Sequence, residues 1–122
     1  MIKGIGTDLV EIERIRKACE RPGFAERVFT EEERRQAEGR SRMLAGDFAV
    51  KEAVSKVLGC GLSGIAFSEV ETLRLPSGKP EVRLSGRAEV LARDLGIRRV
   101  HVSMTNTDTL ALVFVVAEGD EE

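Results

Sequence analysis

FAVKEAVSK, residues 48–56, decides the fold because it forms the centre of the longest helix that the sequence predicts. At helical spacing Ala49 and Ala53 lie on one apolar side, whereas Glu52 and Lys56 lie together, one turn apart. Such a pair can be an ordinary i,i+4 ion pair, which stabilises a helix by roughly 0.2–0.5 kcal/mol. It can also hold a metal ion through the carboxylate and a phosphate through the ammonium. The stretch alone leaves both interpretations open.

The periodicity of apolar residues and the turn-forming residues around this helix predict five strands and four helices. In chain order they are a strand from the N-terminus to about residue 8, helices at 9–19, 31–38 and 43–58, strands at 67–75 and 80–84, a helix at 86–95, and strands at 98–105 and 109–117. This order favours an α+β fold in which a mixed, largely antiparallel sheet packs against the long helix.

Length and composition indicate a single domain, which we expect over residues 1–118 of the 122, followed by an acidic tail at 119–122. The formal charge of −2 gives no sign of a nucleic-acid or membrane partner. No signal peptide is visible, and no segment approaches the roughly 20 apolar residues of a membrane span. Cys19 and Cys60 show neither metal spacing nor a disulfide framework. We therefore expect a cytoplasmic protein with reduced thiols.

Two glycine-containing motifs look like nucleotide-binding loops but lack the required context. GCGLSG (59–64) matches G-x-G-x-x-G, yet it follows a helix, whereas the dinucleotide fingerprint follows a strand. PSGKP (76–80) looks like the end of a P-loop but has Pro80 where Ser or Thr is required. His101 is the only histidine, and no cysteine cluster exists to complete a zinc site. Both glycine segments are interpreted as turns.

Three residues of chemically useful types remain: Asp8 at the end of the first strand, Glu52 within the long helix, and His101 in a late strand. An aspartate at a strand end often only caps a helix or forms a turn. A lone histidine in a strand is more often structural than functional. The residue types by themselves do not choose between these roles.

The sequence resembles the holo-acyl-carrier-protein synthase family over nearly its whole length. The resemblance lies in GIGTDLVEIERI (4–15), RVFTEEE (27–33), FAVKEAVSKVLGCGL (48–62), PSGKPEVRLSGRA (76–88) and HVSMTNT (101–107). It implies a 4′-phosphopantetheinyl transferase-like fold and transfer of 4′-phosphopantetheine from coenzyme A to a serine of acyl carrier protein, with release of 3′,5′-ADP. It also implies a homotrimer with active sites at subunit interfaces.

By this resemblance Asp8 and Glu52 bind Mg²⁺, a cation that commonly takes one or two protein carboxylates and fills its other positions with water and substrate phosphate. Lys56 matches the family's second lysine, and its ammonium offsets charge on the pyrophosphate. Lys51 points about 100° away around the helix. We expect Glu52 to accept the proton of the carrier serine, so that Glu52 and Lys56 are the catalytic residues.

The resemblance further implies a cofactor groove for coenzyme A. His101 matches a histidine near the nucleotide end, while Gly59, Gly61, Lys79 and Pro80 belong to turns that wall the groove. Two positions depart from the family. Asp47 stands where an arginine is usual, so one nucleotide contact is missing or comes from another residue, for which Arg42 is the candidate. Asn106 stands where a histidine is frequent, and its amide cannot exchange a proton near neutral pH.

Arg14 matches an arginine that faces the acidic carrier, and Lys17 and Arg21 extend the same surface. The alternative is that all three are ordinary solvated charges. For the whole chain, the alternative function is a catalytically impaired module that binds coenzyme A. The sequence leaves open whether the carrier serves fatty-acid or polyketide synthesis, and whether Mn²⁺ replaces Mg²⁺.

Overall fold

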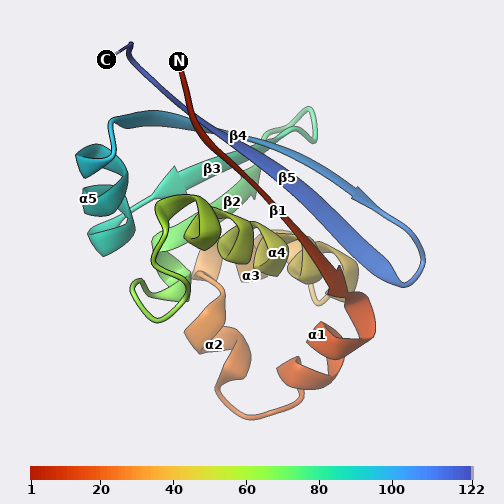
Figure 1. Cartoon of the computed structure of the whole chain (residues 1–122). Helices are drawn as coiled ribbons and strands as arrows, with labels where there is room; N and C mark the ends of the chain where they lie inside the picture. Colours follow the sequence, from red (N-terminus) through yellow and green to blue (C-terminus); the bar gives the residue numbers. More distant parts are fainter. Residues whose placement is uncertain (122) are drawn as a thin grey trace.

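A computed structural model describes residues 1–121 and shows a three-stranded antiparallel sheet that covers one side of the molecule (Figure 1). The strand order is β1-β5-β4, with bounds of Ile2–Glu11 for β1, Leu110–Gly119 for β5 and Ile97–Asn106 for β4. β5 pairs with both neighbours, so β1 and β4 are the two edge strands of this sheet.

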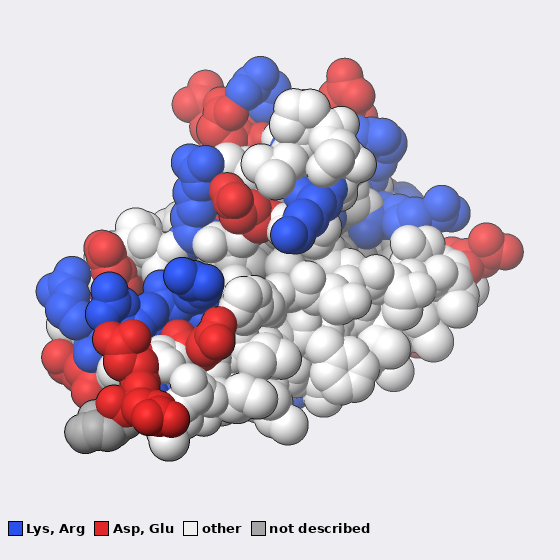
Figure 2. All heavy atoms as spheres, turned by 90° about the horizontal axis from the view of Figure 1, so that it is seen from above, with Lys and Arg blue, Asp and Glu red and all other residues white. Residues whose placement is uncertain are grey.

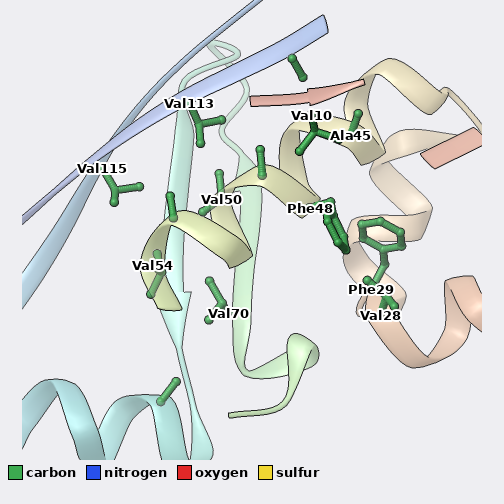
Figure 3. Packing of buried hydrophobic residues seen from close by; sticks show 14 of the residues in the cluster. Val10, Val28, Phe29, Ala45, Phe48, Val50, Val54, Val70, Val113 and Val115 are labelled. Carbon is green, nitrogen blue, oxygen red and sulfur yellow. The ribbon is translucent and has the colours of Figure 1, made fainter. Parts of the chain in front are cut away.

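Helix α4 (Ser41–Leu58) lies across the inner face of the sheet and is buried on most of its sides. Twelve of its 18 residues are buried, which is typical of a helix that is enclosed by protein rather than lying on a surface. Figure 3 shows Val50 and Val54 of α4 within the core, which also includes Val113 and Val115 of the sheet. The long helix predicted at 43–58 is therefore confirmed and begins two residues earlier.

A second, two-stranded antiparallel sheet packs on the other side of α4 and consists of β2 (Val70–Arg74) and β3 (Pro80–Leu84). Shorter helices complete the fold: α1 (Ile12–Cys19), α2 (Phe24–Val28), α3 (Glu31–Ala37), the 3-10 turn η1 (Phe67–Glu69) and α5 (Gly86–Asp94). The observed order confirms the predicted α+β class with largely antiparallel strands.

A buried ion pair joins α3, α4 and β2. The Lys51 ammonium donates hydrogen bonds to both carboxylate oxygens of Glu33, at 2.8 and 3.1 Å, and to the carbonyls of Phe67 and Val70. Glu33 also accepts the backbone N–H of Thr72 at 2.8 Å. Both charged groups are fully buried and multiply hydrogen-bonded, the condition under which such a pair is tolerated in a core. This cluster fixes the rotation of α4 and thereby the direction in which its other side chains point.

Three local predictions need correction. The first strand continues to Glu11, so Asp8 lies within β1 rather than at its end, because pairing with β5 extends to Glu11 opposite Leu110. Helix α2 was not predicted, since five residues are too few to show a helical period. The segment predicted as a strand at 67–75 begins with the 3-10 turn η1 before β2.

The division into a domain of residues 1–118 and an acidic tail stays a prediction. Strand β5 runs through Gly119, and Glu122 lies outside the described residues. Within residues 1–121 no helix combines the length and the apolar character that crossing a membrane would require.

Candidate active site

Asp8, Glu52 and Lys56 come together where β1 crosses α4. The Lys56 ammonium donates hydrogen bonds to Asp8 Oδ1 at 3.1 Å and to the carbonyl of Thr7 at 3.0 Å. The close approach of strand and helix depends on Gly6, where a Cβ would lie 2.6 Å from the carbonyl oxygen of Ala53. Asp8 and Glu52 are 44 residues apart in the sequence but lie at one site in the structure, as the resemblance implies.

The two carboxylates interact electrostatically. Partial burial raises the pKa of Glu52, and the negative charge of Asp8 raises it further, while the positive charges of Arg14 and Lys56 lower it. The other oxygen of Asp8, Oδ2, is buried without a hydrogen-bond partner among residues 1–121. An unpaired buried carboxylate oxygen beside a second acid is a ready ligand for a cation.

These residues fit Mg²⁺ rather than a metal held entirely by protein. Within residues 1–121 no group of three or more His, Cys, Asp or Glu side chains is arranged to hold a metal ion. Mg²⁺ commonly needs only one or two carboxylates, because water and substrate phosphates supply its remaining ligands. Asp8 and Glu52 are the two carboxylates that could supply such a partial site.

The turn that contains Gly59 and Gly61 follows directly after Lys56. Gly59 ends α4 with a φ of 75°, and Gly61 has a φ of 62°, a left-handed conformation that favours glycine at both positions. The N–H groups of both glycines bond back to carbonyls in the last turn of the helix. The predicted turn is confirmed, and it lies next to the Lys56 end of the site.

A second concave region lies along the opposite edge of the sheet. This cavity, which we call the β4-edge cavity, has a volume of about 740 Å³, within the range of small-molecule sites. Its lining includes the predicted residues Arg42 and Pro80, together with residues of the β4–β5 hairpin. Asp8, Glu52 and Lys56 do not line it. Within one chain, the predicted site residues therefore fall into two groups. One group is the cluster of Asp8, Glu52 and Lys56, and the other consists of Arg42 and Pro80 in the β4-edge cavity.

His101 and Lys79 are not brought to either group in a single chain. His101 lies on the outer face of β4, where its Nε2 is 2.9 Å from Oε1 of Glu118 on β5. This contact lowers the pKa of the Glu118 carboxyl. Lys79 lies in the exposed turn before β3, and its side chain does not line the β4-edge cavity. The alternation of Val100, Val102 and Met104 around His101 already indicates that the histidine faces away from the core.

Asp47 is buried rather than facing a substrate, which was not predicted. Its Oδ1 accepts a short hydrogen bond from the Arg74 guanidinium, and Arg74 lines the β4-edge cavity. Burial raises the pKa of Asp47 to about 7, although the positive charge of Arg74 lowers it. Arg74 carried no sequence signal, because its contact with Asp47 joins two elements 27 residues apart.

The predicted carrier-binding residues Arg14, Lys17 and Arg21 lie along one hollow of about 350 Å³ beside α1. Its apolar lining includes Phe24 and Phe48. The guanidinium carbon of Arg14 is 5.6 Å from the centroid of the Phe48 ring, and that of Arg21 is 5.3 Å from the Phe24 ring. This hollow combines positive charge with aromatic surface next to Glu52, whose pKa the Arg14 charge lowers.

Comparison with known proteins identifies the family of this chain. Residues 4–105 match the sequence model of the 4′-phosphopantetheinyl transferase superfamily. A holo-[acyl-carrier-protein] synthase of Lachnoclostridium phytofermentans is 48% identical over 118 residues, which cover 97% of each chain. Among solved structures, a Bacillus anthracis holo-(acyl-carrier-protein) synthase in complex with coenzyme A (3′,5′-ADP) has a TM-score of 0.81 and 34% identity, covering 98% of this chain and 99% of that one.

A Plasmodium yoelii acyl carrier protein synthase with ADP bound has a TM-score of 0.89 and 29% identity, covering 99% of this chain and 98% of that one. The matches to these three proteins cover nearly the whole of this chain. The chain belongs to the holo-acyl-carrier-protein synthase family of the 4′-phosphopantetheinyl transferase superfamily.

Proposed function

We propose that this protein transfers 4′-phosphopantetheine from coenzyme A to a serine of apo acyl carrier protein, with Asp8, Glu52 and Lys56 as the reacting centre. The observation that carries the proposal is the cluster itself: an unpaired buried oxygen of Asp8, a second acid with a raised pKa, and an ammonium that already bonds Asp8. Phosphoryl transfer needs positioning and charge stabilisation more than covalent chemistry, and this cluster supplies both.

Asp8 and Glu52 would hold Mg²⁺, which when bound takes up negative charge on the diphosphate of coenzyme A. Lys56 neutralises charge on the departing 3′,5′-ADP. The serine oxygen forms a bond to the phosphorus on the pantetheine side, and the bond from that phosphorus to 3′,5′-ADP breaks. Glu52 accepts the serine proton from its position beside Asp8 and Lys56.

The separation of the two predicted groups supports an assembly in which sites form between copies. Asp8 lies on edge strand β1, whereas Arg42 and Pro80 line a cavity along edge strand β4. A head-to-tail interface would bring the β1 side of one copy to the β4 side of the next, and such an interface forms a ring when the rotation between copies closes. We propose that the ring is a homotrimer with active sites at its interfaces.

The outer face of the sheet supports the same proposal. Ile5, Leu9 and Phe114 project from it and are 69%, 57% and 55% exposed. Figure 2 shows this side of the molecule as a broad surface with few charged groups, bordered by Lys, Arg, Asp and Glu. A large exposed apolar surface on a small domain is typical of a face covered by another protein. Covering it would also place His101, on the same face, at the interface.

We propose that the acidic carrier docks on the α1 hollow through Arg14, Lys17 and Arg21. Their positive charge is complementary to an acidic partner, and the adjacent aromatic rings provide apolar contact area. Because Arg14 is close enough to Glu52 to lower its pKa, a carrier bound there would present its serine near the reacting centre. A cytoplasmic location is proposed from the free thiols of Cys19 and Cys60.

Mass spectrometry of apo carrier protein tests the function directly. Incubation with the protein, coenzyme A and Mg²⁺ should add one phosphopantetheine group to the carrier, and chelation of the divalent ion should prevent it. Glu52→Gln should abolish the gain, because the amide neither takes the proton nor carries the charge that a metal requires. Binding of coenzyme A with no gain in carrier mass would select the alternative, a catalytically impaired binding module.

A further inference from the structure

We propose that Arg74, held in place by Asp47, binds the 3′-phosphate of coenzyme A in the β4-edge cavity. The inference rests on the proposed function and names the part of the donor that this cavity takes. Coenzyme A has two anionic parts, a diphosphate and a 3′-phosphate on its ribose. Because the diphosphate belongs to the cluster of Asp8, Glu52 and Lys56, the anion left for a second, positively charged cavity is the 3′-phosphate.

The guanidinium of Arg74 is positioned but not fully used by protein. One of its terminal nitrogens, Nη1, donates to Asp47 Oδ1, and the other, Nη2, is 3.7 Å from the sulfur of Met104, a weak acceptor. A guanidinium has five N–H donors, so Arg74 retains donors for a further acceptor. Its side chain is 17% exposed, and it lines the cavity. Planar, paired N–H donors of this kind match the oxygens of a phosphate.

Several neighbours fix Arg74 in this position. The side-chain amide of Gln36 clamps its backbone from both sides, accepting the Arg74 N–H at 2.8 Å and donating to its carbonyl at 3.0 Å. Gly46 leaves the space that the side chain crosses: a Cβ there would lie 3.7 Å from Nη2 of Arg74 and 2.6 Å from Cε of Met104. An arginine fixed at its backbone and at one nitrogen loses little further freedom when it binds a ligand.

The charge of the cavity favours an anion. Its lining contains three arginines, Arg40, Arg42 and Arg74, and one carboxylate, Asp108. Arg40 donates to the carbonyls of Gln36 and Ala37, so its guanidinium is largely committed to the protein. Arg42 is exposed at the start of α4 and adds positive charge at the rim. Of the three, Arg74 alone combines partial burial with a fixed direction, which is where a charged hydrogen bond is strongest.

Asp47 acts as a positioning residue for Arg74. It is fully buried and orients the guanidinium through one oxygen, while its Oδ2 has no partner among residues 1–121. In this chain the aspartate at position 47 thus orients an arginine of β2 toward the phosphate.

Steady-state kinetics with coenzyme A and 3′-dephospho-coenzyme A as alternative donors test the proposal. Arg74→Met should raise the KM for coenzyme A about tenfold or more, the usual effect of losing one charged hydrogen bond. The kcat and the KM for the carrier should stay within about twofold, since Arg74 is remote from the reacting atoms. The KM for 3′-dephospho-coenzyme A should not change. Arg83→Met is the matched control, because Arg83 is exposed on β3 and outside the cavity lining.

Two further variants separate positioning from folding. Asp47→Leu keeps the branched shape but cannot accept the bond from Arg74, so it should raise the KM for coenzyme A as Arg74→Met does. In the Arg74→Met background it should add nothing, because the residue it positions is already gone. That double variant replaces the ion pair with apolar groups and is expected to fold. Asp47→Asn, whose amide oxygen still accepts the bond, should restore most of the affinity.

Arg74→Met with an unchanged KM, or with an equal increase for both donors, would overturn the assignment of the 3′-phosphate. An increase from Asp47→Leu of equal size in both backgrounds would overturn the positioning role. Failure of the wild-type protein to modify any carrier with either donor would instead contradict the proposed function.

Discussion

Lys51 and Lys56 stand on the same helix and carry the same group, yet their surroundings give them opposite roles. Lys51 is fully buried and satisfied by Glu33 and two carbonyls, whereas the Lys56 side chain is 57% exposed and meets Asp8. Because Lys51 is fully buried and its ammonium is bonded only to protein groups, its role is structural. Exposure beside a carboxylate with an unpaired oxygen makes Lys56 available to a phosphate.

Replacing each lysine with methionine should therefore produce different defects. Lys51→Met leaves the Glu33 carboxylate buried without its cation and should lower the free energy of unfolding by about 3–5 kcal/mol. Lys56→Met should leave stability nearly unchanged but reduce kcat about 100-fold or more, since it removes charge stabilisation from the leaving group. Urea denaturation and the carrier assay measure the two effects. Equal loss of stability in both variants would contradict this division.

Asp47 predicts a pH dependence of stability. Its pKa is about 7 when folded and 3.8 in its unperturbed state, so between these values the folded protein binds more protons than the unfolded chain. The contribution of Asp47 to stability therefore decreases as pH rises from about 4 to about 7 and is constant above that range. Glu33, Lys51 and Arg74 are the charged groups that act on it.

Asp47→Asn cannot titrate, so urea denaturation from pH 4 to pH 8 should show a shallower fall of stability with pH than in the wild type. A residual slope of the same sign is expected from Glu52, whose pKa is also raised. Arg83→Met serves as the control and should keep the wild-type slope. Identical slopes in wild type and Asp47→Asn would show that Asp47 is ionised throughout.

The sequence predicted which residues meet in the proposed reacting centre better than which residues meet in the cavity. Asp8, Glu52 and Lys56 belong to motifs with specific spacing, and the structure brings them together as expected. The contact between Arg74 and Asp47 was not predicted, because no local sequence pattern shows which end of a strand faces which turn of a helix. Their contact depends on how β2 packs against α4, which is a property of the tertiary fold.

At the scale of elements, α4 illustrates why some predictions succeed. Its apolar periodicity and the stop at Gly59 are local signals, so its bounds were predicted to within two residues. The start of α3 is also marked locally, since Thr30 followed by Glu33 three residues later is the pattern of a capping box. In the structure Thr30 accepts the N–H of Glu33 and Glu33 accepts that of Thr30. The end of β1 was not predicted correctly. The apolar pattern that begins near Leu9 favours a helix, but hydrogen bonding to β5 keeps the chain extended to Glu11.

The crossing of β1 and α4 makes Gly6 a sensitive position. Gly6→Ala would place a methyl group 2.6 Å from the Ala53 carbonyl and 3.0 Å from Val57 Cγ2, so the helix must move away from the strand. We expect a loss of about 1–3 kcal/mol in the free energy of unfolding, as for other overpacked sites. Activity should fall more steeply, because Asp8 and Glu52 lie on the two elements that separate.

Gly4→Ala is the matched control for this change. Its added methyl group would meet only Val57 Cγ1, at 3.1 Å, and a side-chain methyl can shift where a backbone carbonyl cannot. Thermal unfolding and kcat measured for both variants should rank Gly6→Ala as the more damaging. The reverse order would show that the strand and helix are not in rigid contact at Gly6.

At the scale of the whole molecule, the exposed apolar face and the two separated site groups lead to one prediction. Phe114→Glu places a charge in the middle of the outer face of the sheet and should dissociate the proposed trimer. Analytical ultracentrifugation should then report monomers, and transfer activity should be lost although the fold is retained. Val90→Glu, on the exposed surface of α5, should change neither property. A fully active Phe114→Glu monomer would contradict sites shared between copies.

The placement of Asp8 on one edge strand and the β4-edge cavity along the other has a genetic consequence. Each junction in the proposed ring would use one flank from each of two neighbours, so a chain damaged on one flank would still offer the other intact. Coexpressed chains, one lacking Asp8 and the other disabled in the cavity, would form mixed rings in which some junctions pair two undamaged flanks. Two alleles that are inactive separately would then complement each other within a single cell.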